Sequence, residues 1–157
     1  MTLVVGSIVL VALVLLTLLA LRFFGGLFAV ADLPCALSAQ DTRIAEAYMS
    51  HDSDGSDQTT VFTSADQSFY PRVTLSCPYA GVIVGASLIV VDAPGSGAEP
   101  GRVLQNLSYV LTEADASHRK RGMWFHFQNR QLWPPGKYRV DISLNGASNQ
   151  SINFEVR

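Results

Sequence analysis

The sequence has few of the residues on which metal and catalytic sites depend. It has two cysteines with no Cys-x-x-Cys pair, and its three histidines, His51, His118 and His126, show no ligand spacing with them. No GxSxG, glycine-rich phosphate loop or HExxH motif is present. Nothing in the spacing brings His118 or His126 to Asp115 or Asp141 as a catalytic pair. We therefore expect a protein that is not an enzyme and that uses no cofactor or metal.

Charge is missing from the stretch Leu3–Leu21, which is apolar throughout and is followed by Arg22. A helix of this length covers about 28 Å, close to the ~30 Å hydrocarbon core of a bilayer. The aromatic residues and paired glycines of Phe23–Ala31 suit the membrane interface. The sequence therefore predicts a single-pass membrane anchor with an interfacial segment at residues 1–31.

A cleaved signal peptide is the main alternative to a retained anchor. No Lys or Arg precedes the apolar run, and the run exceeds a usual signal core, although Ala29–Ala31 could serve as a distant cleavage site. Taken literally, the positive-inside rule would place the domain in the cytoplasm, because Arg22 and Arg43 lie on the C-terminal side of the apolar run. A short N-terminal tail and the acidic segment that follows favour a signal anchor. We expect an extracytoplasmic domain, periplasmic or extracellular.

Residues 32–59 are expected to form a short helix and an acidic linker. In Ser38–Ser50, Ser38 can cap a helix on which Ile44, Ala47 and Tyr48 share a face. The following His51–Thr60 contains no apolar residue. Its carboxylates suggest a weak calcium candidate, but the glycine comes too early for an EF-hand and a solvated linker is the default interpretation. The candidate ligands are Asp52, Asp54 and Asp57.

From residue 60 to 157 the sequence predicts an all-β domain. Short apolar runs separated by turn residues are typical of an antiparallel sandwich of about seven strands. The strands are expected near residues 60–63, 70–77, 82–91, 103–111, 123–128, 137–144 and 151–156. The last two alternate apolar and polar residues and should pair through a turn at Asn145-Gly146. The strand at 82–91 is apolar on both faces, so we expect it to be central or covered.

The segment Pro135–Ile142 resembles a corner of immunoglobulin-like and fibronectin type III-like sandwiches, in which a tyrosine hydroxyl turns back onto the backbone. The resemblance covers roughly residues 60–157 and implies that Tyr138 is that structural residue. Cys77 has no partner in the sixth strand and the third strand lacks the core tryptophan, so the antibody disulfide is not expected. Cys35 and Cys77 either pair with each other in an oxidising compartment or remain a free and a buried thiol.

Basic and aromatic residues are interleaved in one window that contains no Asp or Glu, from residue 118 to 139. Such a window can bind anionic lipid or glycan through charge and stacking. The alternative is that Met123, Phe125 and Phe127 are core and that Trp133 plugs the end of the sandwich. The candidate interaction residues are Arg119, Lys120, Arg121, Trp124, Arg130 and Trp133.

These features predict a membrane-anchored, non-enzymatic interaction or accessory subunit of a larger membrane complex. The expected partners are the lipid bilayer and other membrane protein subunits, with no nucleic acid. A module that recognises anionic lipid or glycan through the basic aromatic window is the first alternative. A secreted β-sandwich released by signal cleavage is the second.

Overall fold

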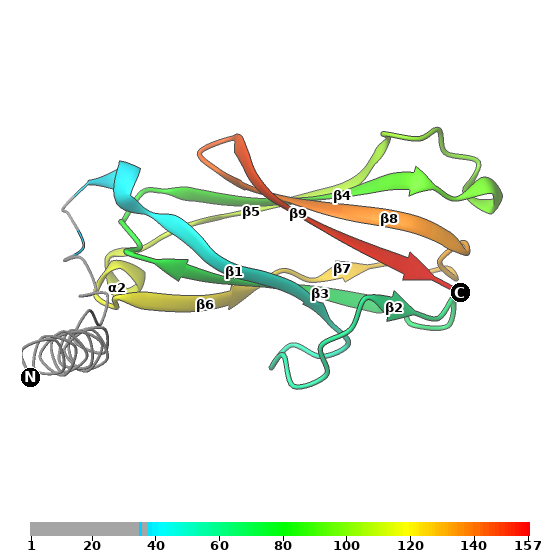
Figure 1. Cartoon of the computed structure of the whole chain (residues 1–157), viewed down its shortest axis with the longest axis horizontal. Helices are drawn as coiled ribbons and strands as arrows, with labels where there is room; N and C mark the ends of the chain where they lie inside the picture. The colour runs from blue at the N-terminus through cyan, green and yellow to red at the C-terminus, as the bar shows by residue number, and fades with distance from the viewer. Residues whose placement is uncertain (1–34, 36–37) are drawn as a thin grey trace, which may run out of the picture. The chain divides into compact units, whose positions relative to one another are not determined.

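The computed structural model describes residue 35 and residues 38–157, which form two β-sheets lying face to face (Figure 1). The expected membrane anchor at residues 1–31 lies outside the described residues. Within the part of the chain that is described, no helix is long and apolar enough to cross a bilayer. The elements are η1 (Ala39–Asp41), β1 (Arg43–Ser50), β2 (Val61–Phe62), β3 (Ser68–Ser76), β4 (Ile83–Asp92), η2 (Pro94–Ser96), β5 (Val103–Val110), α2 (Glu113–Ala116), β6 (Lys120–Trp124), β7 (Phe127–Gln128), β8 (Gly136–Leu144) and β9 (Ala147–Val156).

The described residues therefore form a β-sandwich, as the sequence predicted. The first sheet has the order β1-β3-β6, with β7 also pairing with β3, and the second has the order β2-β9-β8-β4-β5. Neighbouring strands are antiparallel except for β2 and β9, which are parallel. This order makes β1 one edge of the first sheet and β6 with β7 the other, and it makes β2 and β5 the edges of the second.

Strict alternation along the strands builds the core between the sheets. On β3 every second residue is buried, and on β8 Tyr138, Val140 and Ile142 are at most 1% exposed. Aromatic rings fill the space between the sheets. The centroid of the Phe69 ring lies 4.7 Å from that of Trp133 and 5.1 Å from that of Phe154. The core thus depends on large rings contributed by both sheets.

The predicted pairing of the last two strands is confirmed. β8 and β9 form an antiparallel hairpin, and the two residues between them, Asn145 and Gly146, have φ angles of 50° and 83°. Positive φ at both central residues is the geometry of a tight hairpin turn, which asparagine and glycine tolerate. β4 is also central as expected, because it pairs with β8 on one side and β5 on the other.

The prediction of a short helix at residues 38–50 is wrong. Only Ala39–Asp41 form a single 3-10 turn, and Arg43–Ser50 are strand β1, paired with β3. A bulge between Ile44 and Glu46 shifts the register, so that Ile44 lies opposite Leu75 and Ala47 opposite Val73. Ile44 and Ala47 therefore face the core at a spacing of three residues, which imitates a helical pattern. The compact unit begins at Cys35, and β1 is part of the sandwich rather than of a linker.

Candidate binding surface at the β6 edge

Thr112-Glu113-Ala114-Asp115, between β5 and β6, has the sequence of a helix capping box. The Thr112 hydroxyl accepts from the Asp115 backbone N–H at 3.3 Å, and the Asp115 carboxylate accepts from the Thr112 backbone N–H at 2.9 Å. This reciprocal pair forms the single turn α2 and holds Asp115 with only 4% of its surface exposed. The capping pattern was the sequence signal that could have located this carboxylate.

The buried Asp115 connects the edge strands of the two sheets. Its carboxylate accepts from the Tyr109 hydroxyl on β5 at 3.0 Å and from Arg121 Nε on β6 at 2.8 Å. The Thr112 backbone N–H, and then the Thr112 hydroxyl, lower the pKa of Asp115 to about 2 against the opposing effect of burial, with smaller contributions from Tyr109 and Arg121. The carboxylate is therefore ionised at neutral pH and fixes Arg121 in place. Nearly half of the Arg121 side chain, 46%, remains exposed.

A groove of about 360 Å³ follows this connection along the β6 edge. We call it the β6-edge groove. It combines two guanidinium groups with exposed aromatic rings: Tyr109 is 42% and Trp124 48% exposed. Its lining residues are Arg72, Tyr109, Leu111, Asp115, Arg121, Gly122, Met123 and Trp124. The groove can hold a carboxylate or other anion against its rings. Its one carboxylate is already hydrogen-bonded to four groups and is not placed for proton transfer.

Aromatic residues extend from the groove across the outer face of the first sheet. The rings of Tyr70 and His126 stack with centroids 4.8 Å apart, and Trp124 meets the Tyr70 ring edge-on at 5.9 Å. Arg72 lies opposite Trp124 in the β3–β6 register and donates to the carbonyl of Ser53. That contact connects the loop after β1 to the sheet.

The carboxylate of Asp52, one of the calcium candidates, is hydrogen-bonded within the acidic loop that follows β1. The Asp52 carboxylate accepts from the backbone N–H groups of Gly55 at 2.7 Å, Ser56 at 3.0 Å and Asp57 at 3.1 Å. The Ser56 hydroxyl, followed by other donors of the loop, holds the pKa of Asp52 well below its usual range. Among the residues that the structure describes, no three acidic, histidine or cysteine side chains group as metal ligands.

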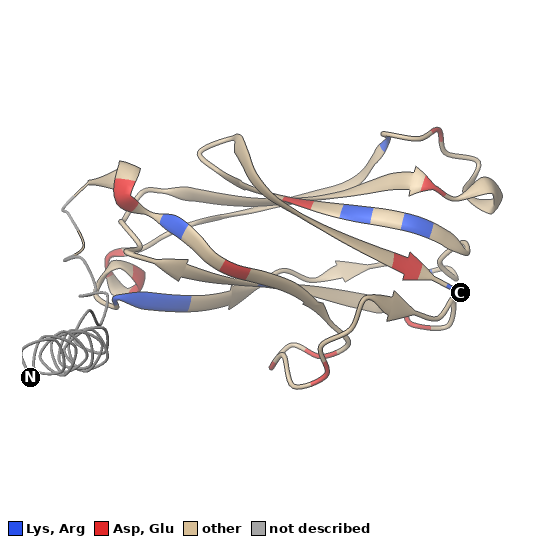
Figure 2. Ribbon diagram, in the orientation of Figure 1, with Lys and Arg blue, Asp and Glu red and all other residues tan. Residues whose placement is uncertain are grey.

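The structure divides the predicted basic window between the two ends of the sandwich. Arg119, Lys120 and Arg121 lie together at the start of β6 beside α2 (Figure 2). Arg130 lies in the loop between β7 and β8, which bonds to the segment before β3 through Asn129 N–H and the Gln67 carbonyl. The six candidate residues therefore do not form one patch.

The prediction that Trp133 is an interaction residue is wrong. It is 2% exposed and stacks on Phe69, so its ring belongs to the core and cannot meet a partner at the surface. Nearby, the Tyr138 hydroxyl donates to the Pro134 carbonyl at 2.7 Å, which connects the start of β8 to the loop before it. Burial raises the pKa of the Tyr138 hydroxyl.

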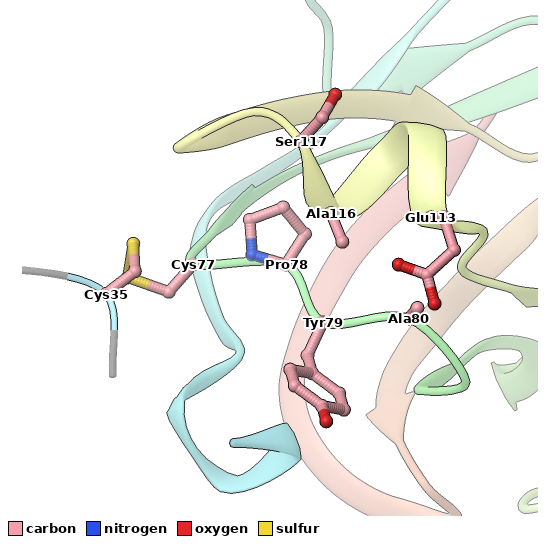
Figure 3. A pocket seen from close by; sticks show the side chains of 8 residues that line it. All are labelled: Cys35, Cys77, Pro78, Tyr79, Ala80, Glu113, Ala116 and Ser117. Carbon is pink, nitrogen blue, oxygen red and sulfur yellow. A yellow bond between two sulfur atoms is a disulfide. The ribbon is translucent and has the colours of Figure 1, made fainter. Parts of the chain in front are cut away.

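A second hollow, of about 500 Å³, lies beside the disulfide between Cys35 and Cys77 (Figure 3). Cys77 holds three segments together, because its N–H donates to the Arg119 carbonyl at 2.9 Å and its carbonyl accepts from the Thr42 hydroxyl at 3.0 Å. Glu113 is the charged residue of the lining, which also includes Pro78, Tyr79 and Ala116. The bond thus anchors residue 35 to the sandwich at the end where β6 begins.

No family model matches this chain, and no curated protein matches it either. Among solved structures, an immunoglobulin-like protein from Pseudomonas aeruginosa is 16% identical, with 74% of this chain and 96% of that chain covered and a TM-score of 0.47. An alkylpurine DNA glycosylase from Pseudomonas fluorescens is 18% identical over 74% of this chain and 30% of its own, with a TM-score of 0.44. A β-glucosidase from Listeria innocua is 18% identical over 71% of this chain and 16% of its own, also with a TM-score of 0.44. This chain spans less than a third of either enzyme, and neither activity is transferred to it.

Proposed function

We propose that this protein is a membrane-anchored, extracytoplasmic binding domain that acts as an accessory subunit of a larger membrane complex. The observation that carries the proposal is the β6-edge groove, where exposed rings and guanidinium groups surround a carboxylate that is already satisfied by Thr112, Tyr109 and Arg121. Such an arrangement favours recognition over catalysis, because its charged groups are held in place and its aromatic surface is open.

Two further features support this proposal. The disulfide between Cys35 and Cys77 supports an extracytoplasmic location, because structural disulfides persist in oxidising compartments. It also ties the sandwich to residue 35, which comes 14 residues after the apolar segment Leu3–Leu21 in the sequence, and so supports a short connection between domain and proposed anchor.

An immunoglobulin-like topology is part of the proposal. When the two-residue strands β2 and β7 are left out of the count, the first, second and fifth strands (β1, β3 and β6) form one sheet and β9-β8-β4-β5 form the other. This differs from the constant-type antibody arrangement only in that the fourth strand, β5, pairs with β4 in the second sheet. The hydrogen bond from Tyr138 to Pro134 supports the same assignment, since a tyrosine at the start of the sixth strand closes that corner. Folds of this kind host many functions, so the assignment adds no activity.

The proposal is tested by purifying the full-length protein in mild detergent after cross-linking in intact membranes. We expect a defined membrane protein partner to co-purify and to cross-link at positions beside the β6-edge groove. A monodisperse, solitary protein that gives no cross-linked species would overturn the accessory-subunit function.

A ligand-binding module is the second candidate, and the observation that favours it is the row of Tyr70, Trp124 and His126 beside Arg72. Stacked rings with a cation nearby suit a glycan or an anionic lipid headgroup. Binding of the protein to anionic vesicles separates the candidates. If lipid is the ligand, the protein should bind these vesicles and lose that binding when the charge of Arg72, beside the rings, is reversed, whereas a subunit that recognises only a protein partner should not bind the vesicles. A secreted form, released after Ala31, is tested by the mature N-terminus in a mass spectrum.

A further inference from the structure

The backbone of β6 has an open edge with a definable hydrogen-bonding register. The Cys77 N–H bonds to the Arg119 carbonyl and the Phe125 N–H bonds to the Pro71 carbonyl, so the odd-numbered residues of this segment bond to β3. In an antiparallel pair the intervening residues direct their N–H and C=O groups the other way. Lys120, Gly122 and Trp124 therefore present their backbone groups to the open side, because β6 pairs with β3 alone.

Gly122 leaves the middle of this edge uncovered. A Cβ placed there meets nothing within 4 Å, and the residue lines the β6-edge groove between Trp124 and Arg121. A glycine inside a strand often marks a place where another backbone approaches closely. The open backbone groups and the groove thus coincide.

Charge distinguishes β6 from the other edge strands that the structure describes. β6 carries Lys120 and Arg121 and follows Arg119, whereas β1 carries both signs and a bulge, β2 has two residues and β5 has no charge. Positive charge along an edge prevents two copies from pairing there by repulsion. The same charge favours an extended segment of opposite sign. The nearby carboxylate, Asp115, compensates the charge of Arg121, with which it is paired, so the net positive charge of this edge comes from Arg119 and Lys120.

We infer that β6 binds an extended acidic segment of a partner protein, which adds to the first sheet as a further antiparallel or parallel strand. This inference rests on the proposed function and names the partner's chemistry. Main-chain bonds to Lys120, Gly122 and Trp124 supply the affinity, and Arg119 and Lys120 select carboxylates. Trp124, 48% exposed, lies beside the added strand.

The test titrates the full-length protein in neutral detergent micelles with a short peptide of alternating valine and glutamate. Trp124 reports binding by fluorescence, because the other tryptophan, Trp133, is buried. The variant Gly122→Pro removes one open N–H and places a ring where there is space. Its matched control is Ser108→Pro on the β5 edge. The Leu111 N–H bonds to the Val82 carbonyl, so the odd-numbered residues of β5 bond to β4. The N–H of Ser108, an even-numbered residue, therefore points to the open side of β5.

We expect Gly122→Pro and the double variant Arg119→Glu with Lys120→Glu each to weaken the peptide's binding roughly tenfold or more, while Ser108→Pro binds as the parent does. The same peptide with lysine in place of glutamate should not bind. Thermal melts establish that each variant is folded. Full binding by a folded Gly122→Pro would show that no strand is added and would overturn the inference. If the acidic peptide fails to bind while a partner still co-purifies, the inference is wrong and the proposed function stands. If no partner co-purifies either, both are wrong.

Discussion

At the scale of single residues, Asp115 is the side chain on which the β6-edge groove most depends. It is the one buried charged residue in the described part of the chain, and its carboxylate joins Thr112 of the α2 turn, Tyr109 of β5 and Arg121 of β6. A buried charge is tolerated when hydrogen bonds and an opposite charge replace the lost water. Both conditions are met here, so Asp115 determines the position of Arg121 and, through it, the shape of the groove.

Asp115→Asn should lower the free energy of unfolding by about 1–3 kcal/mol at neutral pH, because charged hydrogen bonds to Thr112 and Arg121 are lost. The folded-state pKa of about 2 lies below the ordinary value of 3.8. The ionised carboxylate therefore contributes fully above about pH 4, and its contribution disappears as the pH falls towards 2. Urea unfolding at several pH values should show the deficit of the variant shrinking over that range.

The matched control is Asp92→Asn, which changes an exposed carboxylate at the end of β4. Its effect on stability should be small at every pH. A deficit in Asp115→Asn that stays constant down to pH 2 would contradict an electrostatic role for the carboxylate.

At the scale of elements, turns and bulges decide where strands begin and which face they bury. The β8–β9 hairpin closes through Asn145 and Gly146, both with positive φ, which fixes the register of the longest strand pair. The bulge in β1 instead changes which residues face the core partway along the strand. A regular turn is therefore visible in the sequence, whereas a bulge conceals the strand that contains it.

Gly146→Ala should reduce stability by about 1–2 kcal/mol, since a side chain disfavours the left-handed backbone at φ 83°. The added methyl group has free space, so backbone strain alone accounts for the loss. Thermal unfolding measures the change. Gly95→Ala, at a glycine without positive φ, is the control and should leave the melting temperature nearly unchanged. Equal losses in the two variants would rule out the turn geometry as the cause.

At the scale of the whole molecule, the disulfide and the groove lie towards the same end of the sandwich. Cys77 is bonded to Cys35, and its N–H is bonded to Arg119 at the start of β6. The covalent bond therefore holds residue 35 near Arg119, where the basic cluster Arg119, Lys120 and Arg121 begins.

Replacing both cysteines with serine should lower the free energy of unfolding by about 3–5 kcal/mol, because the bond closes a loop with a sequence separation of 42. The double variant avoids leaving an unpaired thiol. Urea unfolding of the parent with and without reductant should reproduce the difference, whereas reductant should leave the double variant unchanged. Unaltered stability of the parent after complete reduction would contradict a structural role for the bond.

The sequence by itself determined the class of fold and most of the strands, because alternation and turn residues are local properties. The alternating apolar residues Tyr138, Val140 and Ile142 predict a strand without reference to the rest of the chain, and the pair Asn145-Gly146 predicts the turn that follows. The single strand expected at 123–128 is observed as β6 and β7, which pair with β3 in the same register and are separated only by Phe125 and His126.

Only the tertiary structure decided how distant segments meet. It made Arg43–Ser50 a strand through pairing with β3 and joined Cys35 to Cys77. It also separated Arg130 and Trp133 from Arg119, Lys120 and Arg121, and it built the groove from β3, β5 and β6 around Asp115. The basic residues are close in sequence, which predicted one patch. In the structure the window runs along β6 and β7 from one end of the sandwich towards the other, so its first and last basic residues are far apart. The physical reason is that strand register and packing determine which side chains meet across a sheet or between sheets. These contacts join residues that are far apart in the sequence, and no local pattern of residues encodes them.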